Sequence, residues 1–102
     1  MLTYIITKTA PDTLTVKFGE DSHNGPKVVD AKAQLDALGE DGELQGEIIK
    51  VNGPASLPVA MTIGHVLAHR YQAVACFDPK QNHFVVAIAH GGKYAVGDVI
   101  PG

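Results

Sequence analysis

The sequence predicts a single α+β domain over residues 1–102, built from a mixed β-sheet with helices on one face. Short β-branched or alternating segments of strand length recur along the chain, and two longer segments have helical periodicity. Turn residues separate these segments, which gives the order β-β-α-β-α-β-β. With 45% hydrophobic and 19% charged residues, the chain has enough apolar side chains to bury a core, which argues against disorder.

The first half of the chain predicts a hairpin followed by a helix. The expected elements are a strand over 3–9, a turn at 11–12, a strand over 13–18, a polar loop over 19–26 and a helix over 28–38. Gly39 is expected to end this helix. The acidic segment 40–46 is expected to be a solvated connector, with an acidic metal-binding cluster as the alternative.

The second half predicts a strand, a second helix and a closing hairpin. The expected elements are a strand over 47–51, a helix over 57–71, strands over 73–77 and 84–89, and an edge strand within 97–100. The helix is expected to bury one apolar face, formed by Leu57, Ala60, Met61, Gly64, Leu67, Ala68 and Tyr71. No internal repeat divides the chain.

Charge and composition restrict the classes of function. A formal net charge of −3 argues against a protein that binds duplex nucleic acid without sequence preference, because such proteins need a basic surface. The longest apolar runs are of strand length, so no membrane span is expected. The N-terminus does not have the pattern of a signal peptide, and a cytoplasmic protein is the default expectation. Cys76 is the only cysteine and is expected to be buried in a strand, with a nucleophilic role as the alternative.

The segment between the third strand and the second helix is a candidate anion site. It comprises Asn52, Gly53, Pro54, Ala55 and Ser56. The first turn of a helix presents unpaired N–H groups and the positive end of the helix dipole. We expect Ser56 to be the N-cap and Gly53 to let the backbone approach a ligand closely. The segment is neither a Walker loop nor a G-x-G-x-x-G motif, and a well-capped connection is the structural alternative.

Two further groups of polar residues invite a chemical interpretation. His65 and His69 are spaced i, i+4 on the second helix, but the HExxH glutamate is missing, so a polar helix face is favoured over a zinc pair. Asp78 ends one strand of the closing hairpin and His90 ends the next. A regular hairpin places His90 across from Gln72 and separates it from Asp78 by roughly 20 Å, at about 3.3 Å per residue. Asp78 and His90 are therefore expected either to act separately or to meet across a subunit contact.

The chain resembles the small CRISPR-associated ring nucleases of type III systems in four segments, VNGPASLPVAMTIGHVLAHRY, AVACFDPK, FVVAIAH and GDVI. That family degrades cyclic tetra-adenylate and is also described as manganese-dependent RNA deadenylases. The resemblance covers Glu47 to Ile100, about half of the chain, and its ordered set of motifs is fairly specific. Residues 1–46 add only a compatible length and a β-β-α pattern.

The resemblance implies a ferredoxin-like fold and a homodimer that stacks into tetramers or filaments around the cyclic ligand. It implies that the segment from Asn52 to Ser56 lies against the nucleotide, and that Mn²⁺ supports catalysis. It also implies a cleavage face that contains Asp78, Lys80 and His90. We assign His90 as an acid/base or metal ligand, Asp78 as a metal ligand or orienting group, and Lys80 as the counter-charge to phosphate.

Two positions depart from the family pattern. Gln72 follows Tyr71 where some members carry a histidine linked to cleavage, and glutamine is no general acid or base near neutral pH. Lys80 stands where some members have arginine, so the charge is kept but the bidentate phosphate contact is lost. His83, close by in the same turn, is the candidate to compensate.

The expected function is metal-assisted cleavage of cyclic tetra-adenylate, which would switch off type III CRISPR second-messenger signalling. Gln72 favours a first alternative, a sensor or sponge that binds the same ring without cutting it. A second alternative is a manganese-dependent 3′-exonuclease acting on short RNA. A third is an interaction domain that uses its sheet and helix faces.

Overall fold

The computed structural model describes residues 1–102 and arranges six strands and two helices in the order β-β-α-β-α-β-β-β. The elements are β1 (Tyr4–Ala10), β2 (Thr13–Phe18), α1 (Asn24–Glu40), β3 (Gly46–Asn52), α2 (Leu57–Ala68), β4 (Tyr71–Asp78), β5 (His83–Ala89) and β6 (Val99–Pro101). The predicted α+β class and the order of the first seven elements are confirmed. The edge strand expected within 97–100 is β6, which extends one residue further, to Pro101.

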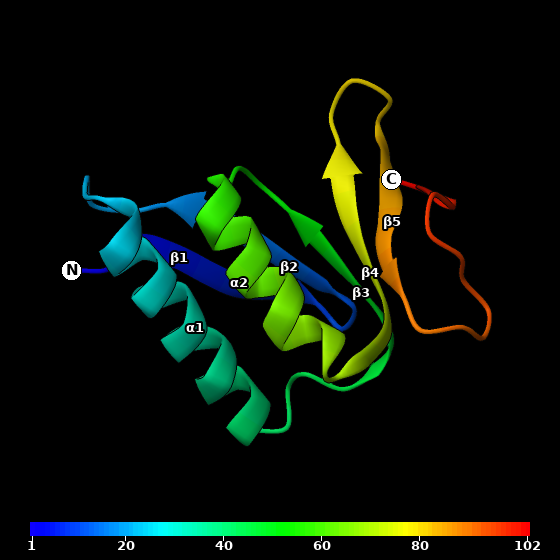
Figure 1. The fold of residues 1–102 in the computed structure, drawn as a ribbon, viewed down its shortest axis with the longest axis horizontal. Helices are drawn as coiled ribbons and strands as arrows, with labels where there is room; N and C mark the ends of the chain where they lie inside the picture. Colours follow the sequence, from blue (N-terminus) through cyan, green and yellow to red (C-terminus); the bar gives the residue numbers. More distant parts are fainter.

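All six strands form one mixed sheet in which the strand order follows the chain, β1-β2-β3-β4-β5-β6. The pairs β2–β3 and β3–β4 are parallel, and the other three pairs are antiparallel. Each helix connects two neighbouring parallel strands, and both helices lie on one face of the sheet (Figure 1). This order differs from that of a ferredoxin-like sheet, in which another strand separates the strands of each β-α-β unit.

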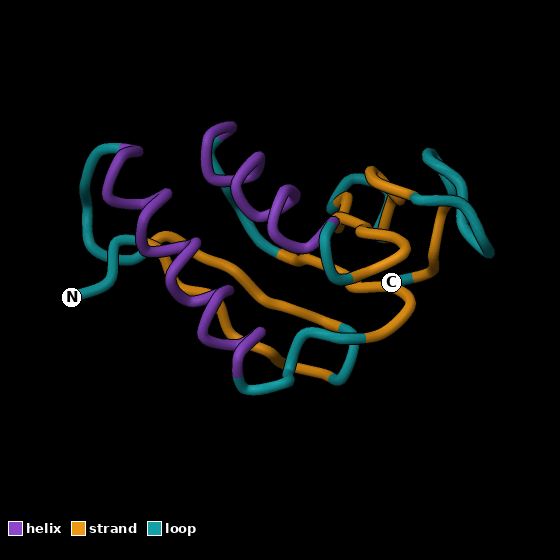
Figure 2. The backbone as a smooth tube through the Cα atoms, turned by 60° about the horizontal axis from the view of Figure 1, so that its bottom comes forward, coloured by secondary structure: helices purple, strands orange, loops and turns teal.

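The main core lies between this sheet face and the two helices. Its fully buried side chains include Tyr4, Leu14, Leu35, Ile49, Val59 and Leu67. A smaller core on the opposite face contains Ala73, Ala75, Phe84 and Val86, with Tyr94 and Ile100 packed against it. The segment between β5 and β6 supplies Tyr94, and Figure 2 shows this segment at the right-hand end of the molecule, opposite the N-terminus. The helices therefore cover the core on one face of the sheet, and the C-terminal segment covers the smaller core on the other face.

Helix α1 is longer than expected at both ends. It begins at Asn24, inside the segment predicted as a loop, because Pro26 is tolerated in a first turn, where its missing N–H costs no helical bond. It continues past Gly39, which was expected to end it, to Glu40. Gly42, with φ 77°, ends it instead, since the Gly42 amide donates to the Gly39 carbonyl and the Glu43 amide to the Leu38 carbonyl. This is a Schellman motif.

Helix α2 ends at Ala68, earlier than predicted, and Tyr71 begins β4. The expected buried face is also wrong in part. Val59, Ile63 and Leu67 are buried, whereas Leu57 and Met61 are 74% and 68% exposed. Apolar residues lie on more than one side of α2, so the pattern alone did not identify the side that faces the sheet.

The β4–β5 hairpin has nearly the predicted register. Asp78 pairs with His83, one residue from the expected Phe84, and the His90 amide donates to the Gln72 carbonyl at 2.8 Å. A register shift between Val74 and Ala75 leaves Ala87 as an extra residue in β5. Asp78 and His90 are therefore at opposite ends of the hairpin, as the strand geometry predicted.

Candidate functional site

The segment from Asn52 to Ser56 connects the carboxyl end of β3 to α2, as predicted, and it is mostly exposed. Gly53 has φ 137°, and a Cβ added there would lie 1.9 Å from the carbonyl oxygen of Val16 in β2. The glycine is required because the segment crosses closely over β2. The close approach seen at Gly53 is therefore to a strand of the same chain, and a close approach to a ligand there stays a prediction.

A hydrogen bond from β1 holds the same segment in place. The Tyr4 hydroxyl donates to the carbonyl of Pro54 at 2.7 Å. The Tyr4 ring belongs to the main core, and burial raises the pKa of Tyr4 to about 12. The segment therefore has a fixed backbone anchored to two strands, which favours a preformed site.

Removing this anchor should change the alkaline stability of the protein. A tyrosine in the unfolded chain titrates near 10.0, and Tyr4 in the folded chain near 12. The stability contributed by the neutral hydroxyl is thus intact below about pH 10 and is lost as pH rises through about 12. In urea titrations at several pH values, Tyr4→Phe should be less stable at neutral pH by about 1 kcal/mol. The difference between wild type and Tyr4→Phe should shrink above pH 10, and a constant difference would contradict this account.

Ser56 occupies the N-cap position of α2, as predicted, and Pro58 lies in the first turn. Its side chain, however, makes no capping hydrogen bond. The Ser56 hydroxyl oxygen is buried and has no hydrogen-bond partner. Because a buried polar atom without a partner is costly, this hydroxyl and the free amides of the first turn together form an unsatisfied donor group. Rotation about χ1 would turn the hydroxyl outward, and an anion could then accept hydrogen bonds from it and from the amides.

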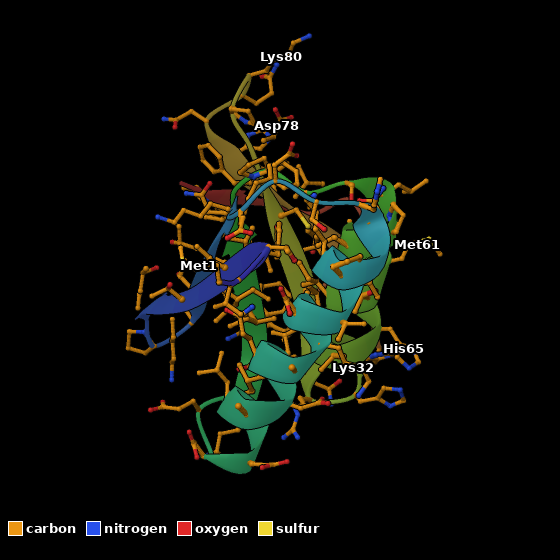
Figure 3. All side chains as sticks on the ribbon, turned by 90° about the vertical axis from the view of Figure 1, so that its left-hand side faces the viewer. Met1, Lys32, Met61, His65, Asp78 and Lys80 are labelled. Atoms are coloured by element: carbon orange, nitrogen blue, oxygen red, sulfur yellow. The ribbon has the colours of Figure 1, made fainter.

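The tip of the hairpin carries the first two residues of the predicted cleavage face. The carboxylate of Asp78 accepts a hydrogen bond from the Lys80 amide at 3.0 Å, the geometry of an Asx turn. The Lys80 side chain is exposed, and Figure 3 shows Asp78 and Lys80 at the outer end of the hairpin. Asp78 thus shapes the turn, and its second carboxylate oxygen has no hydrogen bond.

His90 lies at the other end of the hairpin, beside the C-terminus of α2. Its Nε2 is 2.9 Å from the carbonyl oxygen of Ala68. A carbonyl only accepts, so Nε2 carries the proton and donates, which leaves Nδ1 free to exchange a proton with a ligand. Gln72 is exposed next to it. The ring of His90 is therefore oriented by the helix it caps.

The residues of one chain do not fit the implied Mn²⁺. Its two proposed ligands, Asp78 and His90, lie at opposite ends of the hairpin, and the chain has no group of three side chains suited to hold a metal ion. His65 and His69 do meet, with ring centroids 4.8 Å apart, but no third ligand joins them. Both histidines are exposed, as expected for a polar face of α2.

An apolar groove on the helix-bearing side of the sheet was missed by the sequence reasoning. It has a volume of about 590 Å³ and lies between α2 and the β4–β5 hairpin. Cys76, which was expected to be buried, is exposed and lines the groove. Partial desolvation by the apolar lining of the groove raises the pKa of its thiol. A signal was present in the sequence, because α2 has more apolar residues than one buried face can use.

Comparison with known protein families agrees with this arrangement of motifs. Residues 44–101, more than half of the chain, match the CRISPR-associated protein family Cas_csx3. The match covers β3, α2 and the β4–β5 hairpin, and so includes the Asn52–Ser56 segment, Asp78 and His90. Among proteins of curated function, none matches the chain significantly. Neither helix has the length and apolar character needed to cross a membrane. From the extent of the family match, the chain belongs to the CRISPR-associated Cas_csx3 family.

Proposed function

We propose that this Cas_csx3 chain binds cyclic tetra-adenylate along the Asn52–Ser56 segment and cleaves its phosphodiester bonds. Such an activity would end second-messenger signalling in type III CRISPR defence. The observation that carries the proposal is the buried, unpartnered hydroxyl of Ser56 at the open N-terminus of α2. A ring phosphate placed there would accept hydrogen bonds from this hydroxyl and from the first-turn amides.

The cleavage chemistry is a transfer within the RNA ring. The ribose 2′-hydroxyl attacks the neighbouring phosphorus, the bond from phosphorus to the 5′-oxygen breaks, and a 2′,3′-cyclic phosphate forms. One proton must leave the 2′-hydroxyl and one must reach the departing 5′-oxygen. Nδ1 of His90 is free for such a transfer, because Nε2 is held by Ala68. The ammonium of Lys80 would offset the charge that develops on the phosphate.

Asp78 and His90 can serve one phosphate only if two chains contribute to the site. The hairpin holds them apart within a chain. The carboxylate oxygen of Asp78 that makes no hydrogen bond would therefore orient a reacting group beside the His90 of a second copy. A homodimer that stacks around the ring would provide this arrangement.

A non-catalytic binder of the same ring is the second candidate. The exposed Gln72 favours it, because it lies beside His90 and supplies no acid or base there.

The direct test is to incubate the chain with cyclic tetra-adenylate, with and without Mn²⁺, and to separate the products. Linear or 2′,3′-cyclic products support cleavage. Tight binding by calorimetry without any product selects the binder, and no binding rejects both functions.

Ser56→Ala should separate ligand binding from stability. An N-cap serine that caps its helix costs about 1 kcal/mol when replaced by alanine. Ser56 makes no such hydrogen bond, so its replacement should change the free energy of unfolding by less than about 0.5 kcal/mol. The affinity for cyclic tetra-adenylate should fall about tenfold, since a charge-assisted hydrogen bond is lost. A destabilised variant with unchanged affinity would contradict the assignment of Ser56 to the ligand.

A further inference from the structure

The proposed cleavage chemistry does not use the apolar groove beside α2. Fifteen residues line it, of which twelve are hydrophobic. One wall is the side of α2 that carries Ala60, Gly64 and Ala68, and the opposite wall includes Phe77 and Ile88 from the hairpin. Its volume of about 590 Å³ is within the range of about 300–1,000 Å³ found for small-molecule sites.

The groove exists because the two helices leave part of the sheet uncovered. Helix α2 packs against α1 and β4, and its buried side chains are Val59, Ile63 and Leu67. No helix lies in front of β5 in Figure 1. Small residues on the adjoining side of α2 keep the recess open. At Gly64 the two walls come close, since a Cβ there would lie 3.3 Å from the Ile88 side chain.

We infer that this groove holds an adenine base of the ring whose phosphate is bound at Ser56. The inference rests on the proposed function. Gly53 and Ala55, which belong to the candidate phosphate-binding segment, also line the groove. A nucleotide with its phosphate at the start of α2 therefore has an apolar recess directly next to it.

The lining selects a neutral, flat and largely apolar group. It contains no lysine, arginine, aspartate or glutamate, so a second phosphate would find no counter-charge there. A purine can place its faces against aliphatic side chains and Phe77 while its polar edge stays at the open mouth. His65 is the polar side chain at the lining and lies on α2 with Met61, as Figure 3 shows.

The single thiol of the chain reports on occupancy of the groove. Cys76 is exposed and is the only cysteine, so alkylation by N-ethylmaleimide at mildly alkaline pH follows this one position. Saturating cyclic tetra-adenylate should slow the alkylation about fivefold or more, because a bound base covers the sulfur. Ribose 5-phosphate, which offers a phosphate without a base, should leave the rate unchanged.

A substitution that fills the groove provides the second measurement. Ala60 is exposed on α2, so Ala60→Leu should fold normally and occupy the space of the base. Its affinity for cyclic tetra-adenylate should fall about tenfold or more. Ala37→Leu makes the same change on an exposed position of α1 outside the groove and should bind like wild type. Thermal unfolding of both variants checks that the fold is kept.

The outcomes separate the inference from the function on which it rests. If the ring binds, but Cys76 reacts at its free rate and Ala60→Leu keeps its affinity, the base lies elsewhere and only the inference fails. If no ring binds, the proposed function fails and the inference with it. If Cys76 is protected without ligand, increasingly so at higher protein concentration, a second copy of the chain covers the groove and the inference is overturned.

Discussion

Mixing the Asp78→Asn and His90→Gln variants should restore ring-cleaving activity that neither variant has alone. Each single variant should lose about 10²–10⁴-fold in rate, as expected when a group that transfers or orients a proton is removed. Glutamine at position 90 keeps an amide donor for the Ala68 carbonyl, so the end of α2 stays capped. The loss in that variant then reports on proton transfer rather than on folding.

The recovery follows from the register of the hairpin. Asp78 pairs with His83 at the tip, whereas His90 is hydrogen-bonded to Gln72 at the other end, so one chain cannot bring Asp78 and His90 to one phosphate. In a dimer of the two variants, one of two composite sites has both native residues. Random mixing of subunits therefore gives about a quarter of the wild-type rate.

The control is a mixture in which both subunits carry Asp78→Asn, which should stay inactive. Product formation is measured by chromatography after subunits are allowed to exchange. A mixture as inactive as its components, with exchange verified by mass spectrometry of the complexes, would contradict a site shared between subunits.

Gly53→Ala should be the most destabilising single-methyl change in the chain. At φ 137° an L side chain is strained, and the new Cβ would lie 1.9 Å from the backbone oxygen of Val16. The β3–α2 segment must then move away from β2, which also disturbs the hydrogen bond between Tyr4 and Pro54. We expect a loss of about 3–5 kcal/mol in the free energy of unfolding and a melting temperature lower by about 12 °C or more.

Gly25→Ala is the matched control for this prediction. A Cβ at Gly25 meets nothing within 4 Å apart from its chain neighbours, and the residue is in the first turn of α1 with no positive φ. The change should be within about 1 kcal/mol of neutral, because alanine favours the helix while Pro26 disfavours helical backbone for a preceding residue with a Cβ. Equal melting temperatures for Gly53→Ala and wild type would show that the close approach to β2 is not needed.

The sequence predicted the positions of the helices and strands better than it predicted which side of each is buried. β-branched and alternating segments identified the strands, and the β4–β5 register was expected to within one residue because a tight turn fixes the pairing of a hairpin. The side of α2 that packs on the sheet was predicted wrongly for Leu57 and Met61. Local periodicity does not say which of two apolar sides meets the sheet.

The candidate site shows the same division between local and tertiary information. Asn52–Ser56 was expected to connect strand to helix, with Ser56 at the N-cap, and both expectations are confirmed. The contact of Gly53 with Val16 depends on β2, a strand that is far away in the sequence. A contact between residues so far apart in the sequence cannot be predicted from the residues next to Gly53.

By itself, the sequence determined the α+β class, the strand–segment–helix order around Asn52–Ser56, and the separation of Asp78 from His90. These properties follow from short-range periodicity and turn chemistry. Only the tertiary structure decided that β2 passes under Gly53, that Cys76 is exposed, and that a groove remains open beside α2. The physical reason is that these features depend on how two helices cover six strands, and such packing joins residues from distant parts of the chain.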